Sequence, residues 1–238
     1  MPKPSRRLGH LLAMFKKHSF RYALLRSAEL ARTNLMTHLS TGVFKVKCRV
    51  LGIPYGADIE VYGSVLLRAI SGQITIGSGV QFISSSWRCT ASALAHPVRL
   101  RTFEPSATIV LGDGCGLNGT SITVRSKAVR VGRNSIFGPD CLIVDSDFHD
   151  PSPLEIRKTN PGLERDADVT IGENVWVGAR SVILKGVTIG DNAVIAAGSV
   201  VVSSVPANAL AAGNPARTVR IYDREALGTE AVGALPGD

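Results

Sequence analysis

The chain has 238 residues, of which 45% are hydrophobic and only 5% aromatic, and its formal net charge is +8. This length accommodates one large domain with an appendage, and so few rings suit a core of small aliphatic residues better than a β-sandwich. Because no run of eighteen apolar residues occurs, the sequence predicts no transmembrane helix. The charge is uneven: residues 1–50 contain eleven Lys or Arg against one acid, Glu29, a local balance of +10.

The first 50 residues are predicted to form a basic helical extension. In residues 8–40, apolar residues such as Leu8, Leu11 and Phe15 keep helical spacing, which predicts one or two amphipathic helices. Three roles are open: a cap or subunit contact, a helix on an anionic membrane surface, or nucleic acid binding. The last is the least favoured, because aromatic residues for base stacking are few and no nucleic-acid motif occurs.

Short β segments are expected from residue 41 onward, the first at Val43–Val50, and a six-residue repeat follows from Ile76. The repeat is clearest in residues 169–206, where large aliphatic residues recur every sixth position and a small or medium residue stands four places after each. The aliphatic set is Ile171, Val177, Ile183, Ile189, Ile195 and Val201, and the second set is Val175, Ser181, Val187, Ala193, Ser199 and Val205.

Such a period predicts one short strand and one turn per hexad. Three hexads close a triangular coil, and stacked coils bury a continuous column of aliphatic side chains. A helix is a poor alternative, because Val and Ile are stiff at χ1 and regularly spaced Gly destabilises helices. The predicted fold class is therefore an all-β solenoid over residues 51–222, followed by a tail at 223–238.

Two stretches interrupt the repeat and are expected to be loops, at 87–110 and 144–168. The first is predicted to protrude, with a strand at Val98–Arg101, and its candidates for binding a ligand are His96, Arg99 and Arg101. Cys115 and Cys141 occupy small-residue positions of hexads, and the four cysteines lack a CxxC pair or metal-ligand spacing. We therefore expect buried free thiols, no metal site and a reducing, cytoplasmic location.

The second loop contains Asp145, Asp147, His149 and Asp150 within six residues. A histidine among carboxylates on a loop is a plausible general base. Two alternatives remain open, namely a metal site, since His and Asp are both ligands, and a solvated acidic loop.

Several segments together resemble the hexapeptide-repeat acyltransferases, and in particular the galactoside, maltose and nodulation-factor O-acetyltransferases. They are VTIGENVWVGARSVILKGVTIGDNAVIAAGSVV, the closing AAGNPARTVR, and IVDSDFHDPSP, LNGTSI and PGLE. The resemblance extends over residues 74–222 and implies a left-handed parallel β-helix, a homotrimer, acetyl-CoA as co-substrate and a saccharide acceptor. It also implies direct transfer of the acetyl group, without a covalent enzyme intermediate.

The resemblance assigns roles to individual residues. His149 matches the catalytic base and Asn118 the acceptor-side Asn. Asp147 and Asp145 are the two candidates to orient His149. The positions that match the CoA groove are Trp176, Gly178, Ala179, Ala196, Ala197, Gly198 and Arg217. His96, Arg99 and Arg157 are expected to contact the acceptor.

The chain departs from these relatives at Val202 and Ser203, where they often carry Thr-Lys, so that Lys185 or Arg180 is expected to replace the Lys. One alternative function is an N-acyltransferase acting on an amino-sugar or antibiotic. The other is a non-catalytic or metal-dependent trimeric solenoid. A metal site shared between subunits is disfavoured, because only His96 and His149 lie beyond the N-terminal helices.

Overall fold

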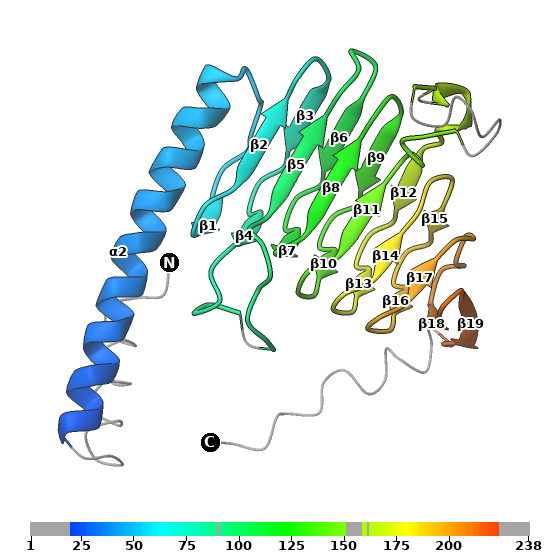
Figure 1. Cartoon of the computed structure of the whole chain (residues 1–238). Helices are drawn as coiled ribbons and strands as arrows, with labels where there is room; N and C mark the ends of the chain where they lie inside the picture. Colours follow the sequence, from blue (N-terminus) through cyan, green and yellow to red (C-terminus); the bar gives the residue numbers. More distant parts are fainter. Residues whose placement is uncertain (1–19, 90, 151–158, 161, 224–238) are drawn as a thin grey trace.

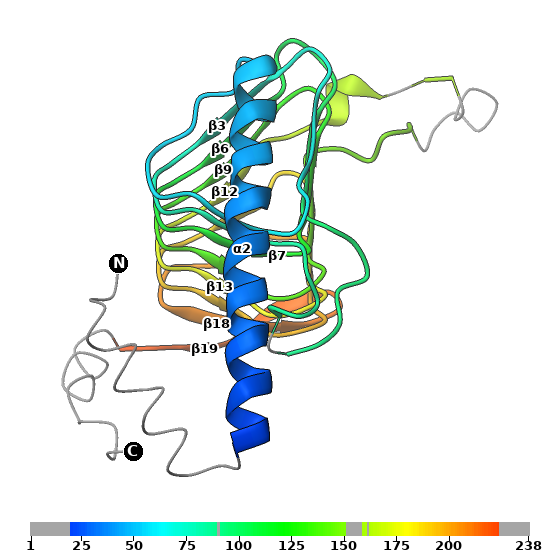
Figure 2. The same ribbon diagram turned by 90° about the vertical axis from the view of Figure 1, so that its left-hand side faces the viewer.

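The computed structural model describes residues 20–89, 91–150, 159–160 and 162–223. A long helix, α2 (Phe20–Val50), lies across one end of a three-sided stack of short strands (Figure 1). Viewed from the helix end, successive coils lie behind one another and two loops project from the corners (Figure 2). Residues 1–19 of the predicted N-terminal extension and residues 224–238 of the predicted tail lie outside the described residues.

The strands form three sheets, one for each side of the stack. Sheet 1 contains β1 (Glu60–Tyr62), β4 (Gln81–Ile83), β7 (Gly116–Asn118), β10 (Ile136–Phe137), β13 (Trp176–Val177), β16 (Val194–Ile195), β18 (Ala209–Gly213) and β19 (Ala216–Ile221). Sheet 2 contains β2 (Leu66–Ala69), β5 (Arg99–Thr102), β8 (Ser121–Val124), β11 (Leu142–Val144), β14 (Val182–Ile183) and β17 (Val200–Val201). Sheet 3 contains β3 (Gln73–Ile76), β6 (Thr108–Leu111), β9 (Ala128–Val131), β12 (Val169–Ile171) and β15 (Thr188–Ile189).

The hexad pattern predicted the interior correctly. Strands of neighbouring coils pair in parallel, so that Ile171 lies opposite Ile189 and Val177 opposite Ile195. All six aliphatic positions of the run are at most 1% exposed, and the residues four places further on are also buried. The fold is therefore a left-handed parallel β-helix preceded by a helix, as expected.

Helix α2 covers the open end of the first coil. Phe44 packs against Phe82 with ring centroids 5.1 Å apart, Cys48 is fully buried, and the Val61 backbone N–H donates to the Thr41 hydroxyl at 3.0 Å. The prediction of a β segment at Val43–Val50 is wrong, because Phe44 and Cys48 lie one helical turn apart and both pack onto the coil. At the opposite end, β19 pairs antiparallel with β18 and ends the stack.

The β-helix is interrupted less than expected. Its first strand, β1, starts at Glu60, which lies within the expected solenoid of residues 51–222 but ahead of the first recognisable hexad at Ile76. The segment 87–110 contains β5 and β6, so the excursion lies between the end of β4 and the start of β5. The strand expected at Val98–Arg101 is confirmed as β5, whereas β6 begins inside a segment that was expected to be a loop.

Cys115 and Cys141 are buried free thiols, as predicted. In the ranges that the structure describes, no helix has the length and apolar character needed to cross a bilayer.

Candidate active site

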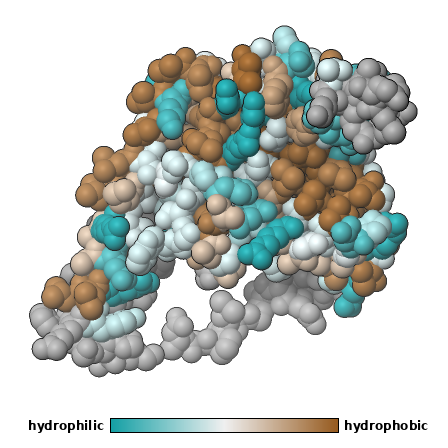
Figure 3. Space-filling model, viewed as in Figure 1, coloured by the Kyte–Doolittle hydropathy of each residue, from teal (hydrophilic) through white to brown (hydrophobic). Residues whose placement is uncertain are grey.

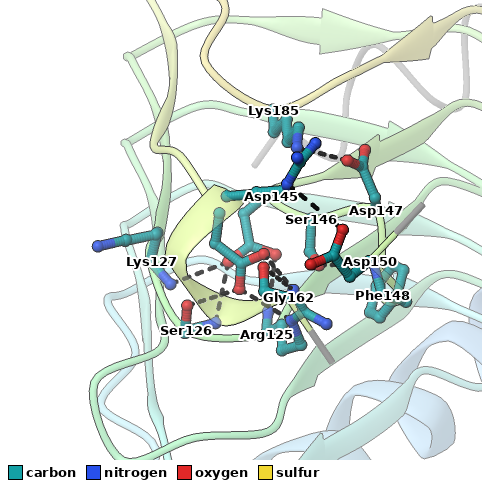
Figure 4. Close-up of polar contacts among 12 residues, drawn as sticks. Arg125, Ser126, Lys127, Asp145, Ser146, Asp147, Phe148, Asp150, Gly162 and Lys185 are labelled. Atoms are coloured by element: carbon teal, nitrogen blue, oxygen red, sulfur yellow. Dashed lines mark hydrogen bonds and ion pairs between the residues drawn. The ribbon is translucent and has the colours of Figure 1, made fainter. Parts of the chain in front are cut away.

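The loop that carries His149 is anchored at its start by Asp145, whose carboxylate is fully buried. It accepts hydrogen bonds from the backbone N–H groups of Arg125 at 2.7 Å, Ser126 at 3.0 Å and Lys127 at 2.9 Å (Figure 4). A carboxylate with three backbone donors stabilises a tight turn. Asp145 therefore joins the start of the loop to the turn after β8.

The end of the loop is anchored by a buried ion pair. Arg125 donates from Nε and Nη2 to Asp166, at 2.8 and 2.5 Å, and also from Nη2 to the Gly162 carbonyl at 3.0 Å (Figure 4). Burial alone would raise the pKa of the Asp166 carboxyl, but hydrogen bonds from Arg125, Ser126 and Ser146 lower it below its ordinary value. Both ends of the loop are thus attached to the preceding coil.

A second set of contacts folds the loop back on itself. Asn160 donates from Nδ2 to Asp150 at 3.0 Å, and its Oδ1 accepts from the Gly162 N–H at 3.0 Å. Gly162 has φ +59°, and a Cβ at this position would lie 3.2 Å from the Asp150 Cα. The short helix η2 (Leu163–Arg165) follows, and the Arg165 side chain lies 3.6 Å from the Asp150 carboxylate.

His149 lies on this anchored loop and is exposed to solvent. Phe148, the residue before it, has φ +64° and donates its N–H to the Ser146 hydroxyl at 2.8 Å. Asp147 forms an ion pair with Lys185 at 2.5 Å, which places Lys185 beside the His149 loop (Figure 4). An exposed imidazole on a constrained backbone is suited to general-base chemistry.

The residues expected to bind CoA gather at a different corner, where the strands of sheet 1 end. Gly178 and Ala179 follow β13, and Ala196, Ala197 and Gly198 follow β16 one coil further on. The coils approach closely there: the Gly198 N–H donates to the Ala179 carbonyl at 2.8 Å, and a Cβ on Gly178 would lie 2.4 Å from the Ala197 nitrogen. Ala197 and Gly198 are exposed, so backbone atoms are accessible at this corner.

Arg217 and Trp176 lie close to this corner. Arg217, on β19, is paired with Ala212 of β18, and its Nη1 donates to the Ala216 carbonyl at 2.9 Å. Trp176 is 56% exposed on the outer face of sheet 1, between Ile136 and Val194 of the neighbouring strands. The other candidate cation, Arg180, is exposed directly after Ala179 and has φ +57°.

Asn118 and the backbone of His96 lie near the same edge of sheet 1, nearer the helix, because a Cβ on Gly119 would lie 2.9 Å from the His96 carbonyl oxygen. Asn118 donates from Nδ2 to the Phe137 carbonyl at 2.7 Å, which links two coils. Asp140 accepts the Ala95 N–H at 3.0 Å, and this holds the loop with the exposed His96 against the corner. Arg99 lies on sheet 2, and Arg157 lies outside the described residues.

The base candidate and the CoA candidates are therefore on opposite edges of sheet 2 within one chain. Asp147 and His149 follow β11, whereas Asn118, Gly178 and Ala197 precede the strands of sheet 2. The sides of the coil are a few extended residues wide, which corresponds to roughly 10 Å. The structure thus groups the predicted residues into two clusters that do not meet in a single protomer.

The Arg125–Asp166 pair was missed by sequence reasoning, because its partners are 41 positions apart and neither belongs to a motif. Among the described residues, no group of three or more His, Cys, Asp or Glu is placed to hold a metal ion.

Comparison with known proteins agrees with the repeat. Residues 168–203 match the family "Bacterial transferase hexapeptide (six repeats)". Nodulation protein L of Rhizobium leguminosarum bv. viciae is 41% identical over 110 residues, covering 46% of this chain and 55% of that protein. "Putative acetyltransferase YJL218W" of Saccharomyces cerevisiae is 38% identical over 114 residues, covering 48% and 56%. The chain thus spans about half the length of these curated relatives.

Among solved structures, AntD, an N-acyltransferase from Bacillus cereus in complex with dTDP and 3-hydroxybutyryl-CoA, superposes with a TM-score of 0.58. The identity is 17%, and the match covers 78% of this chain and 92% of AntD, so it bears on the fold alone. Residues 168–203 carry the bacterial transferase hexapeptide repeat, and the chain is a left-handed β-helix protein similar to the acetyltransferases built on this repeat.

Proposed function

We propose that the protein is an acetyl-CoA-dependent O-acetyltransferase that acts on a saccharide hydroxyl, with His149 as general base. The observation that carries the proposal is the exposed His149 on a loop whose two ends are held by buried carboxylates, Asp145 and Asp166. The imidazole removes the proton of the acceptor hydroxyl as its oxygen attacks the thioester carbonyl. The acetyl group is then transferred directly, and CoA leaves as the thiol.

The corner at Gly178 and Ala197 supports a site for the pantetheine arm. The side chains are absent or small, and a Cβ on Gly198 would meet nothing within 4 Å, so a thin ligand can lie close to the backbone there. Arg217, exposed beyond this corner, is suited to contact the phosphates of the CoA nucleotide. Exposed backbone N–H groups at such turns are suitable donors to the oxyanion that forms during acyl transfer.

A homotrimer is part of the proposal, because His149 and the CoA corner lie on opposite edges of sheet 2. A complete site then consists of the His149 loop of one protomer and the Gly178 corner of its neighbour. Leu142 on β11 is 37% exposed, and Val202, directly after β17, is 46% exposed. The face that carries sheet 2 shows an apolar area (Figure 3, right of centre). Contact between copies over this area would bring the two clusters together.

The test of the chemistry is release of the CoA thiol in the presence of acetyl-CoA and candidate saccharides. His149→Ala should lower turnover by about two to four orders of magnitude, while CoA binding and the melting temperature change little. A variant that keeps near-wild-type transfer would refute the assignment of His149. Amino-sugar acceptors belong in the same panel, because preferential acetylation of an amine would favour an N-acyltransferase.

We further propose that α2 contacts an anionic membrane surface. Exposed apolar residues recur along it at intervals of three or four: Leu35, Leu39, Val43, Val46 and Val50. This stripe, together with the basic first 50 residues, is typical of helices that lie on anionic lipid. Removal of the whole helix is a poor test, because Phe44 and Cys48 belong to the core.

Flotation with vesicles that contain anionic lipid tests this contact. Leu39→Ser combined with Val43→Ser should reduce flotation, whereas Val219→Ser, an exposed apolar position on β19, serves as the control. Equal flotation of both variants would contradict the proposed contact. Loss of self-association in the double variant would instead assign the stripe to subunit contacts.

A further inference from the structure

Three arginines face outward from two neighbouring strands of sheet 2 near the helix end. Arg99 and Arg101 are two positions apart on β5, and Arg68 on β2 lies opposite Arg101 in the parallel register. Neighbouring strands are about 4.8 Å apart and alternate residues about 6.6 Å, so the three side chains rise from a small area. We call Arg68, Arg99 and Arg101 the arginine patch.

No carboxylate neutralises this patch among the described residues. Two outward arginines of sheet 3 and its turns form ion pairs, Arg130 with Asp168 at 3.2 Å and Arg133 with Glu173 at 3.0 Å, whereas no ion pair involves the arginine patch in the described part of the chain. The Nε of Arg101 is buried and lacks a hydrogen-bond partner there. Burial, together with the positive charges of Arg99 and Arg68, lowers the pKa of Arg101, as expected for crowded cations.

A chain of ring contacts connects the patch to the catalytic loop. The Arg101 guanidinium carbon lies 4.0 Å from the centroid of the Phe103 ring, and the Phe103 and Phe148 centroids are 6.2 Å apart. Phe148 directly precedes His149. The patch and the proposed base thus lie on one continuous surface, and one elongated acceptor can reach both.

The adjoining strand adds neutral hydrogen-bond donors. Ser121 and Thr123 of β8 lie opposite Arg99 and Arg101 in the parallel register; Ser121 is partly exposed, whereas Thr123 is only 8% exposed. Guanidinium groups bind phosphate oxygens bidentately, and hydroxyl groups supply further donors. Three positive charges match the two to three negative charges of a diphosphate better than they match a neutral sugar.

We propose that the arginine patch binds a phosphate or diphosphate group of the acceptor, which is therefore a phosphorylated saccharide. This inference rests on the proposed transferase function. The anionic group is held at the patch while another part of the same molecule presents its hydroxyl to His149. The patch selects the acceptor and takes no part in proton transfer.

Calorimetric titration of the full chain with inorganic pyrophosphate tests the anion site without any catalysis. Arg68→Gln combined with Arg101→Gln should weaken binding at least tenfold and reduce its dependence on salt. Arg133→Gln is the matched control and should leave binding unchanged, because Arg133 lies on a turn and already pairs with Glu173. Arg217→Gln controls for binding at the CoA corner. Binding that survives in the double variant, or that is lost only in Arg217→Gln, would overturn the proposal.

Acceptor kinetics then separate the two sources of the anion. A nucleoside-diphosphate sugar and a polyprenyl-diphosphate saccharide in vesicles are compared with the corresponding neutral sugar. For whichever anionic acceptor the enzyme uses, the KM of the double variant should be at least tenfold higher than that of the native protein. Its kcat, and its KM for the neutral sugar, should change little. Equal KM values for anionic and neutral sugars in the native protein would refute the inference, even if transfer itself is efficient. Absence of any transfer with intact pyrophosphate binding would instead refute the proposed function.

Discussion

Arg125 and Asp166 join two segments that are 41 positions apart through two hydrogen bonds of 2.8 and 2.5 Å, and both side chains are almost fully buried. The pair holds the end of the His149 loop on the coil before it. The guanidinium carbon of Arg125 also lies 5.8 Å from the ring centroid of Phe148, the residue before the proposed base, so the pair links the stability of the loop to the chemistry.

Asp166→Asn should destabilise the protein by about 3–5 kcal/mol, because it leaves the buried Arg125 charge without its counter-ion. Urea unfolding followed by circular dichroism measures the change. Glu173→Gln, which breaks the exposed pair with Arg133, is the control and should have little effect. If both variants unfold at the same urea concentration as the native chain, the anchoring role of Asp166 is wrong.

The same pair predicts how stability responds to acid. The pKa of Asp166 is lowered in the folded chain, so its contribution is fully present above the ordinary value of 3.8 and is lost as the pH falls through the lower folded value. The stability difference between the native chain and Asp166→Asn should therefore be constant above about pH 5 and shrink below about pH 4. Unfolding curves at stepped pH values provide the measurement, and a constant difference down to pH 2 would contradict it.

Three buried thiols predict a loss of stability in alkali. Burial raises the pKa of Cys48, Cys115 and Cys141 to about 11 each. Their contribution is fully present below the ordinary pKa of 9.0 and is lost as the pH rises through about 11, because the unfolded chain ionises first. Thiol labelling at pH 8 checks the burial, since the half-buried Cys89 should react well before the other three. Equal labelling rates would show that the coils open readily.

The CoA corner can be tested by two substitutions that should differ in their effect on the melting temperature. Gly178→Ala places a Cβ 2.4 Å from the Ala197 nitrogen, so it should lower the melting temperature as well as activity. Ala197→Leu adds bulk at an exposed position, so it should weaken CoA binding at least tenfold while the melting temperature hardly changes. Thermal melts and CoA titration separate the two effects. Unaltered CoA affinity in Ala197→Leu would exclude this corner as the pantetheine site.

The Asp147–Lys185 pair allows the positioning role of Asp147 to be tested. Its side chains are 47% and 24% exposed, so breaking it should cost only about 0–1 kcal/mol. If Asp147 positions His149, Asp147→Asn should lower kcat roughly tenfold and shift the pH–rate profile, with little change in KM. Lys185→Met is the companion variant, and an unchanged pH profile in both would leave Asp147 with a surface role alone.

Regular features of the fold were predictable because the hexad repeat is local. Each hexad places its own aliphatic residue inward, so Ile171, Ile183 and Ile195 could be assigned to the core without knowledge of any distant contact. The extent of the repeat was harder to predict. Strand β6 begins inside a segment assigned to a loop, and the core contacts of Phe44 and Cys48 override the β character of Val43–Val50.

The sequence by itself determined the three-sided coil, the buried thiols and the loop that carries His149, since each depends on spacing within a few residues. The tertiary structure alone decided that Asp145 and Asp166 anchor this loop, that the Gly178 corner and His149 lie on opposite edges of sheet 2, and that Arg68 joins Arg101 on one surface. These relations depend on which coils become neighbours. Parallel stacking brings together residues that are 20 to 41 positions apart, and a local sequence pattern does not predict such pairs.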